Sequence, residues 1–126
     1  MVKLKATNIE LELMMLHLRP ILPHRDKIGY VAARNTRILK ETLTEFLSFK
    51  AELIQKYGDL DKDADGNELG SISIKPNSPN FAEFTKAFNE IKNIEHEVDL
   101  MTLKYEEAIG ILNGEEILEL DWMFED

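Results

Sequence analysis

Apolar residues recur at three- or four-residue steps from residue 26 to residue 57. The positions that follow this spacing are Ile28, Val31, Ile38, Leu39, Leu43, Phe46, Leu53 and Tyr57. This period is typical of one face of an α-helix. Asp26 is suited to the N-terminal cap, and Gly58 to a left-handed residue that ends the last turn. The pattern therefore predicts one long helix over residues 26–57.

Such a helix is about 48 Å long at about 1.5 Å per residue. A compact domain of 126 residues has a radius of gyration of only about 14 Å. The predicted helix must therefore bend, break near Gly29 or Asn35, or project beyond the rest of its domain. A projecting helix would offer its apolar stripe to a partner protein or to a second copy of the chain.

The residues before this helix predict a short strand and a first helix. Residues 2–5 alternate between apolar and basic side chains, as in an edge strand. Thr7 or Asn8 is suited to cap the helix that follows. Pro20 and Pro23 end this helix, because proline lacks the amide hydrogen and clashes with the preceding turn.

Residues 59–79 predict an acidic hairpin or loop, and residues 80–97 a second core helix. Asp65-Gly66 is a hairpin-turn dipeptide, and residues 71–74 alternate serine with isoleucine. Asn80 and Glu83 have the spacing of a capping box. The apolar residues at helical spacing behind this box are Phe81, Phe84, Phe88, Ile91 and Ile94.

The last third of the chain predicts a strand and two short helices. Residues 98–103 alternate, and we expect this strand to pair with residues 2–5. Short helices are predicted over 105–112 and 115–120, and residues 113–126 form an acidic tail. The whole chain, 1–126, is thus predicted to be a single α+β domain, predominantly helical. Its expected parts are a long antiparallel helix pair, a small β-hairpin or sheet and short C-terminal helices.

Composition excludes several classes of protein. The chain has no cysteine, which rules out a disulfide scaffold, thiolate-bound zinc and a cysteine nucleophile. Its net charge of −9 argues against direct binding of nucleic acid or of an anionic membrane, because both depend on clustered positive charge. No stretch approaches the roughly 20 apolar residues that span a bilayer. Glu10 and Glu12 interrupt the apolar region that a signal peptide would need, so we expect a cytoplasmic protein.

Charge is distributed unevenly along the chain. The first forty residues hold eight basic and three acidic residues, a net charge of +5. From Tyr105 onward there are eight acidic residues and no lysine or arginine, a net charge of −8. This asymmetry is able to align copies head to tail or to hold the acidic end against the basic end. The alternative is that these charges lie on solvated helix faces without a partner.

Candidate chemistry is sparse. Asp61, Asp63 and Asp65 precede Gly66 as in the first half of a calcium loop, but Ile72 stands where such a loop needs a bidentate glutamate. The sequence therefore favours an acidic turn and leaves open a weak ion site. His24-Arg25-Asp26 resembles a kinase tripeptide without the glycine-rich loop that kinases need, and His96 lies between two glutamates without a second histidine. We therefore expect no enzyme, and no catalytic, cofactor or metal residue.

The C-terminal peptide combines apolar anchors with acids. Trp122, Met123 and Phe124 lie among acidic residues close to the chain end. Exposed aromatic side chains with acidic neighbours are suited to docking in a groove with a basic rim. These three residues are therefore candidates for binding a protein partner. In the alternative, Trp122 and Phe124 fold back and seal the core of their own domain.

Three short strings of the chain resemble a known family. They are residues 51–58 (AELIQKYG), 63–68 (DADGNE) and 97–101 (EVDLM), in a layout that begins with a lysine-rich segment and ends in an acidic, leucine-rich one. Layout and strings resemble a family of short, uncharacterised proteins encoded by tailed phages and prophages of Gram-positive bacteria, classed as a domain of unknown function. The resemblance implies a viral origin and a host-cell cytoplasm, and it implies no activity.

These observations favour a non-enzymatic protein–protein interaction or assembly module that forms homo-oligomers through the long helix. A first alternative is an acidic inhibitor, whose surface imitates nucleic acid and occupies the basic cleft of a host nucleic-acid-binding or defence protein. A second alternative is a small-ligand-binding module with a pocket between copies.

Overall fold

A computed structural model describes residues 1–126, apart from the side chain of Leu60. The chain is divided into two compact units. Unit 1 consists of Met1–Leu43 and Glu95–Asp126, and unit 2 of Thr44–Ile94. Helices predominate, and the strands form small two-stranded sheets. The predicted α+β class is therefore confirmed.

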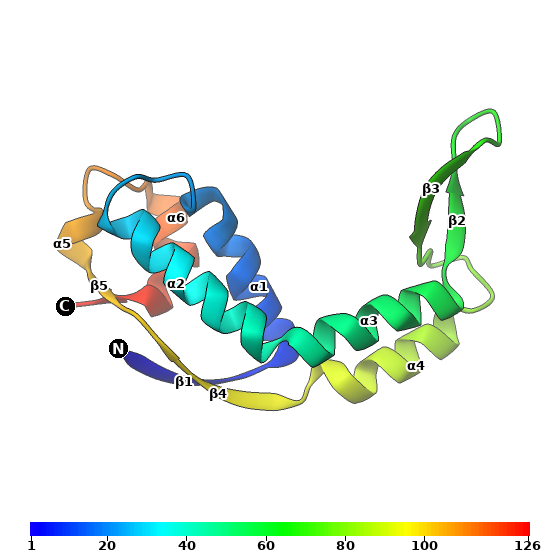
Figure 1. Ribbon diagram of the computed structural model, residues 1–126, viewed down its shortest axis with the longest axis horizontal. Helices are drawn as coiled ribbons and strands as arrows, with labels where there is room; N and C mark the ends of the chain where they lie inside the picture. The colour runs from blue at the N-terminus through cyan, green and yellow to red at the C-terminus, as the bar shows by residue number, and fades with distance from the viewer. The chain divides into compact units, whose positions relative to one another are not determined.

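Two of the helices of unit 1 pack against each other, and one of its two-stranded sheets lies against them (Figure 1). The N-terminal elements are β1 (Val2–Thr7), α1 (Asn8–Leu18), a 3₁₀ turn (Arg19–Ile21) and α2 (Lys27–Thr42). The C-terminal elements are β4 (Glu95–Leu100), β5 (Leu103–Lys104), α5 (Tyr105–Ala108), α6 (Gly114–Glu119), a 3₁₀ turn (Asp121–Met123) and β6 (Phe124–Glu125).

One sheet of unit 1 joins the N-terminal strand to the strand that follows unit 2. Strand β1 pairs with β4 in antiparallel register, from Val2 opposite Leu100 to Thr7 opposite Glu95. The pairing expected between residues 2–5 and the strand after residue 97 is therefore confirmed. The strand begins earlier than predicted, since Glu95 and Glu97 belong to β4 and not to a helix.

Helices α1 and α2 begin at capping residues that the sequence indicates. The Thr7 Oγ1 accepts a hydrogen bond from the Glu10 N–H at 3.3 Å, and Glu10 Oε1 accepts one from the Thr7 N–H at 3.2 Å. This reciprocal pair is a capping box. At the start of α2 the Asp26 Oδ1 accepts a hydrogen bond from the Gly29 N–H at 3.3 Å. Each bond pairs a first-turn N–H that has no partner within its helix.

Gly29 occupies a position where a side chain does not fit. A Cβ atom built on Gly29 lies 1.9 Å from the backbone oxygen of His24, so the turn before α2 must shift to admit one. We expect Gly29→Ala to lower the free energy of unfolding by about 1–3 kcal/mol, the usual cost of overpacking. The control is Gly114→Ala, because nothing lies within 4 Å of a Cβ at Gly114. Chemical denaturation followed by circular dichroism compares the two, and equal stability of both variants would contradict the steric explanation.

The helix predicted over residues 26–57 consists of two helices. Helix α2 ends at Thr42, Leu43 leaves the helical region with φ −91° and ψ 3°, and α3 (Thr44–Tyr57) begins directly after it. The prediction of one uninterrupted helix is therefore wrong, and the break lies at neither Gly29 nor Asn35. Thr42 donates from its hydroxyl to the Ile38 carbonyl at 2.8 Å, a bond that bends helices, and Leu43 is fully buried.

Unit 2 is an antiparallel helix pair with a hairpin at one end (Figure 1). Helix α3 has 14 residues, and α4 (Phe81–Lys92) has 12. The predicted helix pair is therefore present, but it is shorter than expected. Helix α4 ends at Lys92, so residues 93–97 of the predicted second helix lie outside it. Asn80 makes no side-chain capping bond, so the predicted capping box is also wrong.

The predicted hairpin is formed by β2 (Asp59–Lys62) and β3 (Glu68–Ser73), which pair antiparallel. Gly66 in its turn has a φ of +83°, which favours glycine. Gly58 is not among the glycines with positive φ, so its predicted left-handed role is wrong. It is needed for space instead, because a Cβ there lies 2.5 Å from the Ile72 Cγ2.

Candidate protein-interaction surfaces

The C-terminal peptide is docked in unit 1. Strand β6 pairs with β5 in parallel, with Leu103 opposite Phe124. Met123 is 0% exposed, Phe124 is 7% exposed, and the Phe124 ring stacks on Tyr105 with centroids 5.6 Å apart. A role in binding a partner would require Met123 and Phe124 to be exposed. Both are buried, so the structure does not present them as exposed anchors. The structure has the alternative arrangement, in which the peptide seals its own unit.

Trp122 differs from its neighbours because it is only half-buried. Its indole Nε1 is covered and has no hydrogen-bond acceptor among the residues that the structure describes. Burial of a polar N–H without a partner costs free energy. Trp122 is therefore less favourably packed against unit 1 than Met123 and Phe124 are. Of the three candidate residues, Trp122 is the only one that is not buried.

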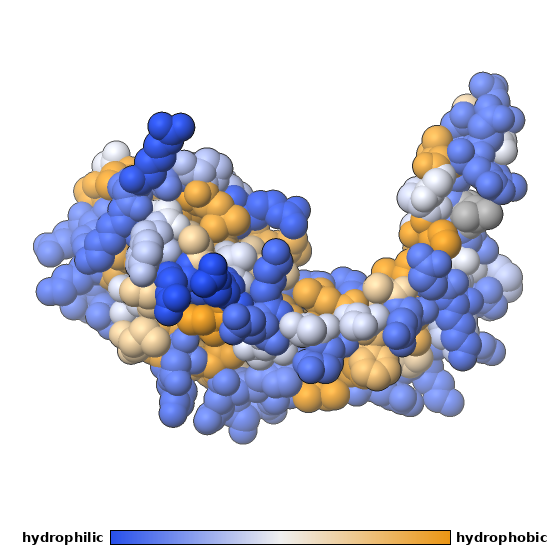
Figure 2. All heavy atoms as spheres, in the orientation of Figure 1, coloured by the Kyte–Doolittle hydropathy of each residue, from blue (hydrophilic) through white to orange (hydrophobic). Residues whose placement is uncertain are grey.

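Two helices of unit 1 carry exposed charge of opposite sign. One surface is a basic face on the exposed side of α2, which consists of Tyr30, Ala33, Arg34 and Arg37. The acidic face consists of Glu115, Leu118 and Glu119 on α6. Strongly hydrophilic side chains gather over the middle of α2 in Figure 2, with apolar patches beside them. The sequence showed these charges only as a net imbalance between the two ends of the chain.

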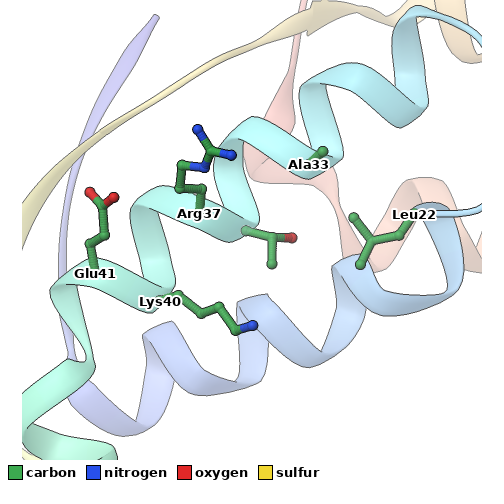
Figure 3. A pocket seen from close by; sticks show the side chains of 6 residues that line it. Leu22, Ala33, Arg37, Lys40 and Glu41 are labelled. Atoms are coloured by element: carbon green, nitrogen blue, oxygen red, sulfur yellow. The ribbon is translucent and has the colours of Figure 1, made fainter.

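An open groove runs along the basic face. It has a volume of about 400 Å³ and is lined by Leu22, Ala33, Thr36, Arg37, Lys40 and Glu41. Figure 3 shows Arg37 and Glu41 on one side of α2, Lys40 extending toward α1, and Leu22 on the segment after α1 with its side chain toward α2. A second hollow of about 270 Å³ adjoins it, because Ala33 and Arg37 line both. An apolar floor with guanidinium groups at its rim suits an acidic, partly apolar ligand.

Helix α1 presents an apolar groove on another side of unit 1. The groove has a volume of about 270 Å³ and is lined by Ile9, Leu13 and Leu16 together with two glutamates. Leu13 is 53% exposed and Leu16 is 47% exposed, although both follow the helical spacing of a core helix. Helix α1 is thus apolar on its outer side as well as on the side buried against α2.

The helices of unit 2 leave much of their apolar surface open. Phe46 alone is fully buried among the side chains that the structure describes in this unit. The Phe84 and Phe88 rings stack with centroids 5.6 Å apart, and Phe46 lies 5.9 Å from Phe88. The large half-buried apolar residues of α3 and α4 are Leu47, Leu53, Ile54, Tyr57, Phe81, Phe84, Phe88 and Ile91. Phe49 is 55% exposed.

The carboxylates of the hairpin are used within the hairpin. Asp61 accepts hydrogen bonds from the hydroxyls of Ser73 and Ser71 and lies 3.8 Å from the Lys75 Nζ. These hydroxyl bonds, Ser73 first, lower the pKa of Asp61. The Asp63 Oδ1 accepts the N–H groups of Asp65 and Asn67, each at 2.9 Å, and the bond from Asn67 is the main cause of its lowered pKa. Internal hydrogen bonds thus account for the conformation of the turn.

The possible ion site and the histidines give no assembled reaction centre. No group of three or more histidine or carboxylate side chains in the described part of the chain is arranged to hold a metal ion. The His24 Nδ1 lies 3.8 Å from the Asp26 carboxylate. The His96 Nε2 lies 2.9 Å from the Asn8 Oδ1, and His96 is in a strand, where the sequence predicted a helix end. His24 thus lies beside the capping residue of α2, and His96 beside the first residue of α1.

Comparison with protein-family models, with curated proteins and with solved structures finds no match to this chain. None of the described helices is both long and apolar enough to cross a membrane. Function must therefore be inferred from the exposed surfaces of the two units themselves.

Proposed function

We propose that this chain is a non-enzymatic protein–protein interaction or assembly module that forms homo-oligomers through α3 and α4. The observation that supports the proposal is the open apolar surface of unit 2, where Phe46 alone is fully buried among the described side chains. The same proposal includes an origin in a phage or prophage and a place in the host-cell cytoplasm. The support for this part is the resemblance of the three short sequence strings.

Two helices alone cannot cover their apolar faces. Phe81, Phe84, Phe88 and Ile91 on α4 alternate in steps of three and four residues, the spacing of a packed helical seam. A domain below about 70–80 residues rarely gains enough stability from one core. The open faces of Thr44–Ile94 therefore need a further layer, and two copies of a helix pair supply it to each other as a four-helix bundle.

Charges along α4 favour a second copy as the occupant. Glu83, Lys86 and Glu90 are exposed and alternate in sign along one edge of the helix. A two-fold contact brings the same patch of both copies together, with one copy running opposite to the other. Such a contact sets the lysine of one copy near a glutamate of its partner, so the edge is complementary to itself.

The test is the state of association with and without the exposed phenylalanine of α3. We expect the wild-type protein to form dimers or larger oligomers at tens of micromolar in sedimentation velocity or light scattering. Phe49→Glu should weaken association by about tenfold or more, because a charge would be buried in the contact. The control is Leu69→Glu, at a 60% exposed leucine of the hairpin. A strictly monomeric wild type, or equal effects of both substitutions, would overturn the proposal.

One specific observation favours the acidic inhibitor as a second candidate. Glu106, Glu115 and Glu119 are exposed and have no ion-pair partner within the described residues. Such carboxylates are able to occupy a basic cleft. This alternative predicts a stoichiometric, salt-sensitive complex with a host nucleic-acid-binding protein in a pull-down, and capture of virion proteins instead would count against it. The small-ligand alternative predicts a thermal shift with nucleotides or calcium.

A further inference from the structure

Arg34 and Arg37 carry charge that unit 1 does not neutralise. Both side chains are exposed, and neither forms an ion pair with any residue that the structure describes. They are three positions apart on α2, a spacing at which like charges repel and lower helix stability. Tyr30, one turn before Arg34, is 61% exposed beside them. Ion pairing within unit 1 therefore does not explain this cluster.

The acidic face of α6 carries charge opposite to that of Arg34 and Arg37. Glu115 and Glu119 are exposed, and neither has an ion-pair partner in the part of the chain that the structure describes. Between them lies Leu118, which at 78% has the highest exposure of the large apolar side chains described. A helix turn with an apolar side chain between two carboxylates matches a groove with an apolar floor and a guanidinium rim.

Among the described residues, one ion pair links the basic N-terminal segment (residues 1–40) to the acidic C-terminal segment (residues 105–126). The Lys27 Nζ at the start of α2 lies 2.7 Å from the Glu107 Oε1. The hydrogen bond from Lys27 contributes most to lowering the pKa of Glu107. This contact shows that the two segments are compatible in charge. Arg34 and Arg37 form no such ion pair within the described residues of their own unit.

We propose that the acidic face of one copy docks on the basic face of a second copy. Leu118 would lie against the apolar floor formed by Leu22 and Ala33, and Glu115 and Glu119 would pair with the two arginines. Planar guanidinium groups are able to bind carboxylates through two parallel hydrogen bonds. This contact uses other residues than the α3–α4 contact, and it stands whether or not that contact forms.

A second copy fits these residues better than nucleic acid does. The groove is lined by Leu22 and Ala33 as well as by charged residues, and Glu41 contributes a carboxylate that repels phosphate. The chain as a whole carries a net charge of −9, so long-range forces oppose a polyanion. A second copy instead brings an apolar side chain and two carboxylates on a single turn.

The experiment is a charge exchange, made in the Phe49→Glu background so that α3–α4 association does not obscure it. One variant carries Arg34→Glu and Arg37→Glu, and the other carries Glu115→Arg and Glu119→Arg. We expect each variant alone to associate at least about tenfold more weakly than the parent in sedimentation velocity at low salt. An equimolar mixture of the two, and a chain with all four substitutions, should regain association, since both contacts are again complementary.

The control reverses two acids elsewhere by Asp65→Arg and Glu68→Arg, which change the net charge as much as the α6 variant and lie in the exposed hairpin. We expect this control to associate like the parent. Association should also weaken as sodium chloride rises from about 50 to about 500 mM, because exposed ion pairs are screened. The proposal is overturned if the parent is monomeric at low salt or if the mixture does not regain association. It is equally overturned if the arginine substitutions abolish only binding of a labelled oligonucleotide.

Discussion

Met123→Ala is expected to lower the free energy of unfolding of unit 1 by about 2–5 kcal/mol, the usual cost of truncating a large buried side chain. Met123 is 0% exposed and lies in the 3₁₀ turn directly before β6. Its loss would leave a cavity beneath the docked peptide and weaken the pairing of β6 with β5. The effect should therefore exceed the loss of one side chain's contacts.

The measurement is urea denaturation followed by tryptophan fluorescence. Trp122 is the sole tryptophan of the chain and lies in the docked peptide, so its emission reports the position of that peptide. The control is Leu118→Ala, since Leu118 is 78% exposed and should change stability by less than about 0.5 kcal/mol. An equally small effect of Met123→Ala would show that the peptide leaves the core readily. In that case Trp122, Met123 and Phe124 would again be available to a partner.

Local sequence signals predicted the elements of unit 1 well. Thr7 and Asp26 are capping residues whose side chains act within three residues, so no distant part of the chain is needed to recognise them. The pairing of β1 with β4 was predicted because residues 2–5 and the segment after residue 97 share a two-residue period. That prediction rested on the alternating patterns of the two segments alone.

The errors lie where long-range packing overrides a local pattern. Leu43 and Phe46 keep the apolar spacing across the end of α2, so the break between α2 and α3 left no mark in the periodicity. Ile94 likewise continues the spacing of α4, although the chain there already turns toward β4. Pairing with β1 draws Glu95–Leu100 into a strand, and a helical pattern of residues does not contain that information.

The interaction surfaces were only partly visible in the sequence. The imbalance of charge between the two ends is a sum over residues, and it does not say which charges lack a partner. Arg34 and Arg37 became distinct only when the packing of α2 on α1 and β4 showed which side of α2 is exposed. Trp122, Met123 and Phe124 were recognisable as a cluster, but docked and free peptides have the same composition.

Asn35→Leu is expected to destabilise unit 1 by about 2–5 kcal/mol, although the two side chains have the same number and branching of heavy atoms. Asn35 is 0% exposed on α2. Its Nδ2 donates to the Met101 carbonyl at 3.0 Å, and its Oδ1 accepts from the Met101 N–H at 2.8 Å. Met101 lies between β4 and β5, where the chain leaves the sheet. Leucine would remove both bonds and leave the part-buried N–H and carbonyl of Met101 without this partner, at up to about 1–3 kcal/mol each.

The matched control is Asn89→Leu, because Asn89 is an exposed asparagine of a helix and should tolerate leucine within about 0.5 kcal/mol. Amide hydrogen exchange distinguishes the proposed cause from a general loss of packing. The Met101 amide should lose its protection in Asn35→Leu while the amides in the middle of α2 keep theirs. If Asn35→Leu is as stable as the parent, water or the chain itself must satisfy the Met101 groups. The passage from β4 to β5 would then not depend on α2.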